Sequence, residues 1–442
     1  MLFKRKLYGE MLKWKKTDGA SALLIKGARR VGKSTLAEDF AKNEYDSYIL
    51  IDFSAAPPAV HELFRDLSDL NYLFMRLQLI YNVTLYKRRS VIIFDEVQKQ
   101  PLARQAIKHL VKDGRYDYIE TGSLLSIRKN IKDIVIPSEE TRLSLYPMDY
   151  EEFCNAVGDE TTVPLLSEAY DKKLPLGDSV NAQMMRKFRL YMLVGGMPQA
   201  VKEYIAANNL ASVDMVKRKI IELYEEDFRK TDPSGRAGML FDAIPSELAK
   251  NASRYQISSV IEGERESRMS EVIADMQDSM TVNIAWHADS PSAGMALSRD
   301  SRRYKLYVCD TGLFTTLAFK DRAFTENVIY EKLLSNKLNS NLGYLYENVA
   351  AQTLRASGNE LYYYTFPRDN SNKNYEIDFI IARKNKICPL EIKSSGYKTH
   401  ASLDAFCSKF SAFTSDSYLV YTKDLKKERA VTCLPIYMLQ FL

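Results

Sequence analysis

Hydrophobic and polar positions in the first third of the chain alternate between short apolar runs and longer stretches with helical spacing. A short apolar run bounded by polar residues is typical of a buried strand, and apolar residues three or four positions apart are typical of an amphipathic helix. The pattern predicts a parallel sheet covered by helices on both faces. The expected elements are strands over Ala22–Lys26, Ser47–Phe53, Ser90–Asp95, Asp117–Thr121 and Thr141–Pro147, and a long helical stretch over Val60–Tyr86.

The middle of the chain has mainly helical spacing. Gly195 and Pro198 divide one long amphipathic stretch into two helices, because both residue types interrupt helices. Further along, helices over Phe241–Lys250 and Arg268–Met280 precede a strand over Thr281–Trp286. Paired helices followed by a β-ribbon predict a winged helix-turn-helix in this region.

The pattern changes again after the polar stretch Ser335–Asn341, which we expect to be a linker. The last third predicts an α/β domain in which three strands follow one another as hairpins. The expected elements are a helix over Gly343–Ala356, strands over Leu361–Phe366, Tyr375–Ala382 and Ile387–Lys393, a helix near Ala401–Phe410, and a strand over Ser417–Thr422.

The predicted fold class is therefore α/β with three domains. Residues 1–157 are expected to form a doubly wound parallel sheet, residues 158–336 a helical winged-helix region, and residues 337–442 a second α/β domain.

Composition excludes several classes of protein. Hydrophobic residues make up 46% and charged residues 27%, which is ordinary globular usage. No apolar run approaches the roughly 20 residues of a membrane span, and the N-terminus lacks the apolar core of a signal peptide. The five cysteines form no CxxC and the four histidines show no metal-ligand spacing. We therefore expect a cytoplasmic protein with reduced thiols and no membrane partner.

The net charge of +5 is too small to indicate a nucleic-acid binder by itself. Residues 1–157 and 337–442 are slightly basic, whereas residues 158–336 are slightly acidic. Any affinity for DNA or RNA is therefore expected at the two ends of the chain.

One segment matches the phosphate-binding motif GxxxxGK[ST] in full, and it follows a predicted strand and opens a predicted helix. Glycines allow a backbone turn whose N–H groups surround a phosphate, and the helix N-terminus adds partial positive charge. Lys33 is expected to reach the β- and γ-phosphates of ATP, and the Ser34 hydroxyl is expected to bind Mg²⁺. The expected nucleotide-binding residues are Gly27, Ala28, Arg29, Arg30, Val31, Gly32, Lys33, Ser34, Thr35 and, from a later strand, Thr121.

The apolar strand that ends in Asp95 and Glu96 supplies the second half of an ATPase site. Asp95 is expected to hold Mg²⁺, and Glu96 to orient and deprotonate the attacking water. The additional strand between this one and the phosphate-binding loop favours a hydrolysing ATPase over a kinase or a small GTPase. Thr121 or Ser123 could sense the γ-phosphate, with strand capping as the equal alternative.

An arginine finger cannot be chosen from the sequence. Arg29, Arg30, Arg128 and Arg142 are all near the site, and a finger from a neighbouring subunit of an oligomer would leave no local mark.

These motifs, together with TGSLL, YPMDYEEF, GGMPQAV and YVCDTGL, resemble the prokaryotic AAA-type ATPases that carry a C-terminal domain of unknown function. The resemblance runs through all three regions. It implies the architecture of the chain but no single agreed activity.

A second constellation lies near the C-terminus. Glu391 and Lys393 alternate on one strand and therefore face the same way. If Asp378 on the adjacent strand points to that side, two carboxylates and an ammonium converge, and Glu347 on the preceding helix adds a third carboxylate. Carboxylates that bind Mg²⁺ and a lysine that positions water are what metal-dependent phosphodiester cleavage needs.

The order of elements around D…ExK is similar to that of the PD-(D/E)xK nuclease superfamily. The resemblance implies a restriction-endonuclease-like domain with Glu347, Asp378, Glu391 and Lys393 at the motif positions. The residues before Asp378 are Glu376 and Ile377, where the superfamily pattern has a proline.

Two functions remain open at this point. In the first, ATP hydrolysis controls a nuclease-like domain that acts on DNA or RNA. In the second, the chain is a regulatory ATPase that binds a protein partner and carries an inactive nuclease fold. The winged-helix region favours a protein partner, because Glu271, Asp275 and Asp278 make the solvent face of its second helix acidic.

Overall fold

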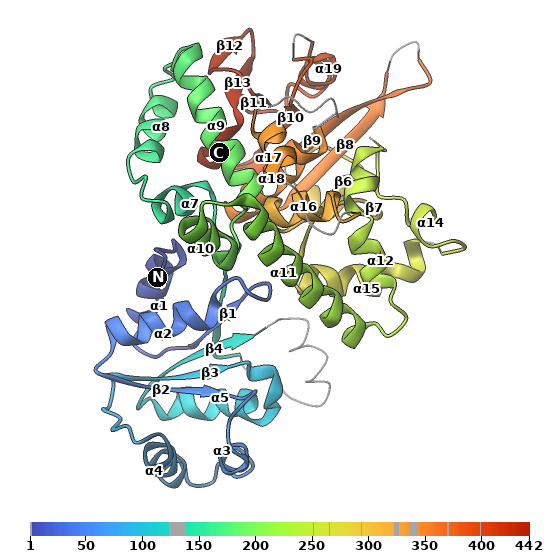
Figure 1. The fold of residues 1–442 in the computed structure, drawn as a ribbon. Coiled ribbons are helices and arrows are strands. Elements are labelled where there is room, and N and C mark those ends of the chain that lie inside the picture. The colour runs from blue at the N-terminus through green and yellow to red at the C-terminus, as the bar shows by residue number, and fades with distance from the viewer. Residues whose placement is uncertain are drawn as a thin grey trace. The chain divides into compact units, whose positions relative to one another are not determined.

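Five parallel strands form the expected sheet in the first third of the chain (Figure 1). Their order is β2-β3-β4-β1-β5, so the strand before the phosphate-binding segment lies between β4 and β5. This sheet confirms the α/β class. Its strands are β1 (Ala22–Lys26), β2 (Ser47–Asp52), β3 (Ser90–Asp95), β4 (Asp117–Gly122) and β5 (Glu140–Ser144).

Helices cover both faces of this sheet, and the alternation of side chains along β1 shows how. Leu23 and Ile25 pack in one hydrophobic core with residues of α1 and α2. Leu24 packs in a second core with residues of α3, α4 and α5. The helices are α1 (Leu7–Lys15), α2 (Lys33–Glu44), α3 (Pro58–Leu63), α4 (Leu70–Tyr81) and α5 (Pro101–Asp113), with the short 3-10 helix η1 (Val97–Lys99) before α5.

The helical stretch expected over Val60–Tyr86 is interrupted, so that expectation was wrong in its middle. The Asp69 carboxylate accepts the backbone N–H groups of Asn71 and Tyr72 at 2.8 and 3.1 Å, which caps α4 and begins a new helix. Asn82 ends α4 in the left-handed conformation, with φ of 52°. Apolar spacing missed the break because α3 and α4 bury their apolar residues in the same core.

The structure, a computed structural model, describes residues 2–122, 138–250, 252–264, 266–292, 294–321, 327–335, 343–368, 371–397 and 399–442. The chain divides into two compact units. The N-terminal unit comprises residues 2–146 with the segment 278–280, and the C-terminal unit comprises residues 147–277 and 281–442.

An eight-stranded sheet of order β12-β13-β11-β10-β9-β8-β6-β7 forms the centre of the C-terminal unit. The expected β-ribbon of a winged helix is the β6–β7 hairpin, but β6 also pairs in parallel with β8. The hairpin is therefore part of the larger sheet rather than a separate wing. The strands are β6 (Val282–Ala288), β7 (Arg299–Val308), β8 (Leu361–Pro367), β9 (Asn374–Arg383), β10 (Lys386–Lys393), β11 (Ser417–Tyr421), β12 (Lys426–Glu428) and β13 (Val431–Pro435).

Helices from the middle and the end of the chain surround this sheet. The two helices expected on either side of Gly195 and Pro198 are α9 and α10. The helices are α7 (Tyr150–Ala156), α8 (Thr162–Asp171), α9 (Asp178–Val194), α10 (Pro198–Ala207), α11 (Leu210–Thr231), α12 (Arg236–Asp242), α13 (Ile244–Ala249), α14 (Ile257–Val260), α15 (Glu266–Asp278), α16 (Thr311–Ala318), α17 (Asn327–Leu334), α18 (Gly343–Ala356) and α19 (Ala401–Lys409), with 3-10 helices η2 (Met295–Ser298) and η3 (Ile436–Phe441).

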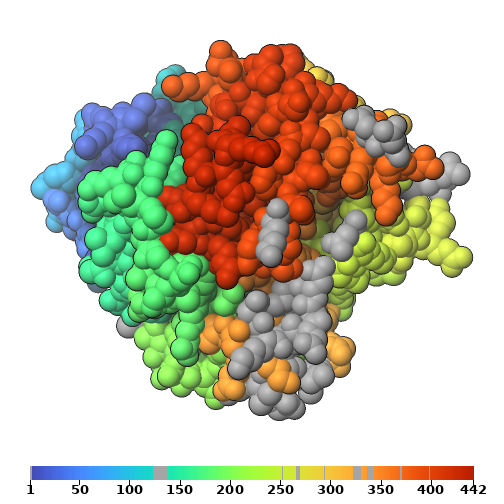
Figure 2. Space-filling model, turned by 90° about the horizontal axis from the view of Figure 1, so that it is seen from above, coloured from blue at the N-terminus to red at the C-terminus, as the bar shows by residue number. Residues whose placement is uncertain are grey.

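The middle and last thirds of the chain are joined by specific contacts. The Asp424 carboxylate accepts the backbone N–H groups of Leu176 and Gly177 at 3.0 and 2.6 Å, just before α9 begins. Within α9, the Asn181 side chain accepts a hydrogen bond from the Tyr437 hydroxyl at 2.9 Å. Figure 2 shows these green and red segments side by side on one face. Where two domains were expected to meet near residue 336, the structure has a single compact unit.

A buried hydrogen-bonded node explains the middle motifs of the sequence. Asp310 is fully buried, and its carboxylate accepts the backbone N–H groups of Gly196 and Leu313 at 2.6 and 2.9 Å. The Gly196 carbonyl accepts the N–H of Met148 at 2.7 Å. The segments GGMP, CDTG and YPMD thus meet at one point, and each supplies a backbone or carboxylate partner to the next.

The node extends to α18 through two side chains. The Tyr191 hydroxyl donates to the Met148 carbonyl at 2.9 Å and accepts a hydrogen bond from the Gln352 amide at 2.9 Å. The Gln352 oxygen in turn accepts from the backbone N–H and the hydroxyl of Thr311, both at 2.8 Å. These groups are buried, and buried polar groups that are fully paired specify one arrangement of the surrounding backbone.

The node gives a testable prediction at Gly196. A Cβ atom there would lie 2.1 Å from the Met148 carbonyl oxygen, so Gly196→Ala forces the two backbone segments apart. We expect a loss of about 3 kcal/mol in the unfolding free energy of the C-terminal unit. The matched control is Gly238→Ala, because a Cβ at Gly238 meets nothing within 4 Å.

Tryptophan fluorescence can measure this loss for one unit at a time. The chain has two tryptophans, Trp14 in α1 and Trp286 in β6, which lie in different units. In a Trp14→Phe background, urea unfolding followed at Trp286 reports the C-terminal unit. Equal midpoints for the Gly196 and Gly238 variants would contradict the prediction.

Candidate functional site

The phosphate-binding segment has an unusual backbone between β1 and α2. Arg30 and Gly32 both have positive φ, at 69° and 99°, on either side of Val31. Such values are rare for residues with a side chain and are typical of glycine, so the turn at Gly32 suits the residue found there. Gly32 is the residue that precedes the first turn of α2, which places the start of the helix at the end of the loop.

Lys33 is held against the loop that it follows. Its side chain is buried, and Nζ donates hydrogen bonds to the carbonyls of Gly27 and Ala28, both at 3.0 Å. The ammonium therefore lies inside the curve of the loop. Of the two residues that follow, Ser34 is half-buried and Thr35 is exposed.

Asp95, Ser34 and Thr121 meet at one carboxylate oxygen. The hydroxyls of Ser34, at 2.7 Å, and of Thr121 both donate to Oδ1 of Asp95. The strand order explains the contact, because β4 carries Thr121 and lies between β1 and β3. The structure thus brings together the residues expected to hold Mg²⁺ and to sense the γ-phosphate. Hydroxyl and carboxylate oxygens are the ligands that Mg²⁺ takes in proteins, so this group suits the metal.

Glu96 has a partner that the sequence analysis missed. Its backbone is left-handed, with φ of 51°, and its side chain accepts a hydrogen bond from the Gln98 amide at 2.6 Å. The Gln98 side chain is buried. The only sequence signal for this role is a polar residue two positions after the carboxylate pair, which is too common to be informative.

A buried ionic cluster lies next to Thr121 in the sheet. Arg104 on α5 forms ion pairs with Glu120 on β4 at 2.8 Å and with Glu140 on β5 at 2.6 Å. Burial raises the pKa of Glu120 to about 8, and the charge of Glu140 acts in the same direction, although Arg104 opposes it. The residue before the candidate sensor is thus a carboxyl group that protonates near neutral pH.

Three of the four candidate arginine fingers lie among the described residues. Arg142 pairs with Glu140 at 2.6 Å through Nε, and its side chain is 46% exposed. Arg29 is half-buried and Arg30 is exposed. Ser123 and Arg128, the other residues considered for sensing and for a finger, lie outside the described residues.

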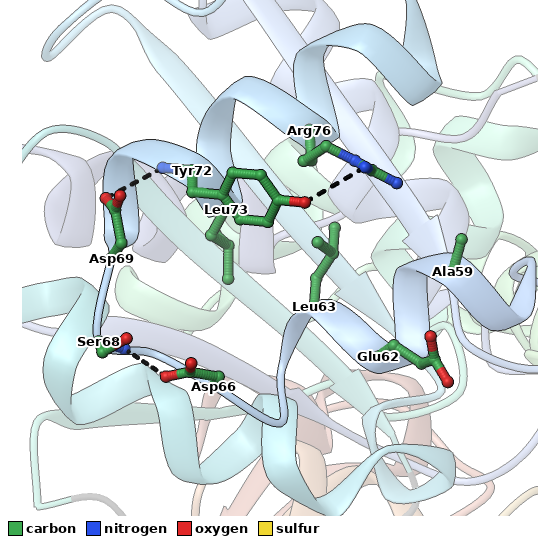
Figure 3. Close-up of a pocket in the computed structure, with 9 residues that line it drawn as sticks. All are labelled: Ala59, Glu62, Leu63, Asp66, Ser68, Asp69, Tyr72, Leu73 and Arg76. Carbon is green, nitrogen blue, oxygen red and sulfur yellow. Dashed lines mark hydrogen bonds between the residues drawn. The ribbon is translucent and has the colours of Figure 1, made fainter.

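A hollow of about 360 Å³ lies between α3 and α4 (Figure 3), and none of the residues that line it belongs to the phosphate-binding loop. Its acidic side chains already have local partners: Asp66 accepts the N–H of Ser68 at 2.9 Å, and Asp69 caps α4. Arg76 donates to the Tyr72 hydroxyl at 3.3 Å. The two aspartates thus stabilise the segment between α3 and α4, and the Arg76–Tyr72 contact lies within α4.

In the C-terminal unit Asp378 lies near one expected carboxylate, Glu347, whereas the interactions of Glu391 are with other groups. The register of β9 with β10 is regular as far as Phe379 opposite Leu390, but a β-bulge lies on the β8 side of β9, where Tyr362 pairs with Ile380 and Tyr364 with Ile377. Asp378 and Phe379 therefore oppose Tyr363 alone, and a bulge redirects side chains relative to simple alternation. The Oδ2 atom of Asp378 accepts the backbone N–H of Ile392 at 2.7 Å.

The neighbours of Asp378 are the carboxyl groups of Glu347 and Glu376 and the ammonium of Lys305. Burial raises the pKa of Asp378 well above its usual range, with Glu347 and Glu376 acting in the same direction and Lys305 against them. Lys305 on β7 forms ion pairs with Glu376 at 2.5 Å and with Glu347 at 3.8 Å. A lysine from the middle of the chain thus supplies the counter-charge.

Glu391 and Lys393 form a separate pair. They are 3.1 Å apart, and the Lys393 ammonium also donates to the carbonyl of Thr399 at 2.8 Å. Burial raises the pKa of Glu391, and Lys393 opposes the rise. The expectation that Asp378, Glu391 and Lys393 form one constellation is therefore not met by their contacts. Across the described ranges, no group of three or more His, Cys, Asp or Glu side chains is arranged to hold a metal ion.

Comparison with protein families gives three matches along the chain. Residues 20–154 match a family described as an AAA domain. Residues 185–323 and 342–439 match two domains of unknown function, DUF8612 and DUF4143 respectively. No protein of curated function matches the sequence.

Three solved structures show only distant similarity. PCH-2 of C. elegans is 12% identical with a TM-score of 0.22, over 36% of this chain and 46% of that one. A signal transduction ATPase with numerous domains and a tetratricopeptide repeat sensor, from Pyrococcus horikoshii, is 10% identical with a TM-score of 0.30, over 80% and 45%. Cdc6p from Pyrobaculum aerophilum is 12% identical with a TM-score of 0.24, over 76% and 97%. The chain spans less than half the length of the first two proteins.

The family match and the loop geometry support an AAA-type, P-loop ATPase domain in the N-terminal unit. They do not extend to the rest of the chain, where the matched families have no assigned function and the restriction-endonuclease-like fold stays a prediction. Within the described ranges, none of the helices has the length and apolar character that crossing a lipid bilayer requires.

The raised pKa of Glu120 predicts a pH dependence of stability. The folded state keeps the proton up to about pH 8, whereas an unfolded glutamate loses it near its ordinary pKa of 4.5. The folded state then binds more protons than the unfolded state between these values, so stability falls as pH rises through this window. Glu120→Gln stays neutral at every pH and removes this contribution.

Thermal unfolding followed at Trp14, in a Trp286→Phe background, tests the prediction in the N-terminal unit. The Tm of the Glu120→Gln protein is expected to rise relative to the parent as pH increases from 5 to 8. Glu62→Gln, a change at an exposed site on α3, is the control and keeps the parental pH profile. Parallel profiles for the Glu120 variant and the parent would refute the assignment.

Proposed function

We propose that this chain binds ATP with Mg²⁺ and hydrolyses it at the site formed by the P-loop, Asp95, Glu96 and Thr121. The observation that carries the proposal is the meeting of the Ser34 and Thr121 hydroxyls on one oxygen of Asp95, beside a separately held Glu96. A strand cap alone would account for Thr121. It would not account for a helix hydroxyl and a buried lysine at the same loop.

Each residue has a distinct part in the proposed reaction. The Lys33 ammonium is held by two neutral carbonyls, and the charged oxygens of the β- and γ-phosphates are stronger acceptors for it. Ser34 and Asp95 would hold Mg²⁺, which neutralises charge on the phosphates when bound. Gln98 holds one oxygen of Glu96, so the other oxygen can accept a proton from the attacking water.

Two substitutions separate binding from hydrolysis. Lys33→Ala is expected to weaken ATP binding about tenfold or more, because it removes the charge that faces the phosphates. Glu96→Gln is expected to keep binding and to lower turnover about 100-fold or more, because an amide cannot accept the proton.

Equilibrium titration with a fluorescent ATP analogue and steady-state phosphate release measure the two effects. Lys42→Ala is the control for Lys33, because Lys42 lies on the same helix with its side chain 54% exposed. Full turnover in the Glu96→Gln protein would remove Glu96 from the role of base.

For the C-terminal unit we propose the second of the two open functions, a regulatory switch with an inactive nuclease-like site. The support is the ion pair of Lys305 with Glu376, together with the separate pairing of Glu391 with Lys393. An ammonium already compensates the acidic groups around Asp378, and the lysine of the ExK pattern is occupied by Glu391 and a backbone carbonyl. Nucleotide state would then control the binding of a protein partner rather than cleavage.

Incubation with DNA and RNA in Mg²⁺ or Mn²⁺ distinguishes the two functions. The proposal expects no cleavage of either nucleic acid and no increase in ATP turnover when they are added. Cleavage that is lost in an Asp378→Asn protein would instead establish the nuclease. Stimulation of turnover by DNA with a steep dependence on salt would establish a nucleic-acid partner.

A further inference from the structure

Arg5 contacts the P-loop from a part of the chain that contains none of the ATPase motifs. It precedes α1 and is half-buried. Its Nη1 atom donates to the Val31 carbonyl at 3.0 Å, and its Nη2 atom donates to the Tyr146 carbonyl at 2.6 Å. These two acceptors are far from Arg5 in the sequence, so the guanidinium joins three separate segments of the N-terminal unit.

The Val31 carbonyl belongs to a part of the loop with unusual backbone angles. Val31 lies between two residues with positive φ, Arg30 and Gly32, and an arginine in that conformation costs roughly 1 kcal/mol or more in general. Such a backbone persists when surrounding contacts hold it. Arg5 supplies one of these contacts on the carbonyl of the central residue.

Orientation of this carbonyl also sets the direction of a neighbouring N–H group. The Val31 carbonyl and the Gly32 N–H belong to one planar trans peptide, in which the two bonds point in opposite directions. When Arg5 holds the oxygen on its own side, the Gly32 N–H is directed to the other side of the loop. Backbone N–H groups are the donors with which such a loop binds phosphate.

The second acceptor of Arg5, the Tyr146 carbonyl, belongs to a segment that lies beside the start of the loop. The Leu145 N–H donates to the Lys26 carbonyl at 2.8 Å, directly before the loop begins. A Cβ atom on Gly27 would lie 2.4 Å from the Leu145 carbonyl oxygen, so the chain at residues 145–146 runs against the start of the loop. Arg5 therefore links residues 145–146, which lie against the start of the loop, to the Val31–Gly32 peptide near the end of the loop.

We propose that Arg5 is a positioning residue for the polyphosphate of the nucleotide: it fixes the Val31–Gly32 peptide so that the Gly32 N–H faces the phosphates. This inference rests on the proposed function, because it needs the P-loop to bind a nucleoside polyphosphate. It requires the planar fork of arginine, since a lysine ammonium cannot direct two hydrogen bonds to both carbonyls with the same geometry.

The test compares ATP with inorganic tripolyphosphate, which has the phosphates but no base or sugar. Affinities of the full chain for both, with Mg²⁺, are measured by calorimetric titration for the parent, Arg5→Lys, Arg5→Ala and Lys13→Ala. Lys13 is a control on α1 with its side chain 72% exposed. We expect both Arg5 variants to lose about tenfold for ATP and for tripolyphosphate alike, while Lys13→Ala binds as the parent does.

Steady-state kinetics and unliganded stability separate positioning from a general loss of structure. The Arg5→Lys protein is expected to keep the Tm of the nucleotide-free parent, to raise KM for ATP about tenfold, and to retain kcat within about twofold. If Arg5→Ala does not fold, Arg5→Lys carries the test. A lower nucleotide-free Tm with unchanged affinities would assign Arg5 a structural role and overturn the inference.

Two other outcomes have different meanings. A loss for ATP without a loss for tripolyphosphate would place Arg5 at the base or sugar and overturn the inference. If the parent binds neither ligand, the proposed function itself fails. If the parent binds both and the Arg5 variants bind equally well, only the role of Arg5 fails.

Discussion

The buried carboxyl group of Asp310 must find hydrogen-bond donors within the protein, and the arrangement of the C-terminal unit depends on this requirement. Burial raises its pKa, while the N–H groups of Gly196, Leu313 and Gly312 act in the opposite direction. To bring Gly196 within reach, the turn between α9 and α10 approaches Met148 so closely that no side chain fits at this position. The motifs GGMP, CDTG and YPMD are thus explained by the close packing of three backbone segments. This explanation requires no catalytic role for them.

The N-terminal unit is organised around a different acidic group, Asp95. Its carboxylate gathers hydroxyls from the helix after the P-loop and from the neighbouring strand, so the strand order of the sheet is what assembles the site. The loop itself is held from behind by Arg5 and along its curve by Lys33. The same lysine that is expected to meet the phosphates therefore also stabilises the loop through its own carbonyls.

Local patterns in the sequence were sufficient for most elements and for the residues that the structure brings together at the P-loop. The bounds of β1, β3 and α18 were predicted to the residue, because each has a clear apolar period and a clear end. The P-loop and the Asp95–Glu96 pair were found because their spacing is short and specific. Gln98 and Arg5 were missed, since their roles depend on contacts that no short motif records.

Two expectations depended on pairing between distant strands. Alternation along β9 predicts where Asp378 points only if the strand is regular, and the bulge opposite Tyr363 interrupts β9 on its β8 side, although its register with β10 is regular through Leu390. In the same way, helical spacing could not show that β6 pairs with β8 rather than forming an independent wing. Both features are decided by tertiary packing, which a pattern within one segment does not contain.

The pairing of β6 with β8 has a consequence for how the chain folds as it is synthesised. β6 and β7 are neighbours in sequence and can form their hairpin early, but β8 begins about 70 residues after β6 ends. Until β8 is synthesised, the free edge of β6 exposes unpaired backbone N–H and C=O groups next to side chains that are buried in the folded protein. Such an edge is a surface for association between nascent chains. The opposite edge, β7, stays at the border of the finished sheet and carries Arg299, Arg302 and Arg303, and charged side chains on an edge strand oppose pairing with a second molecule.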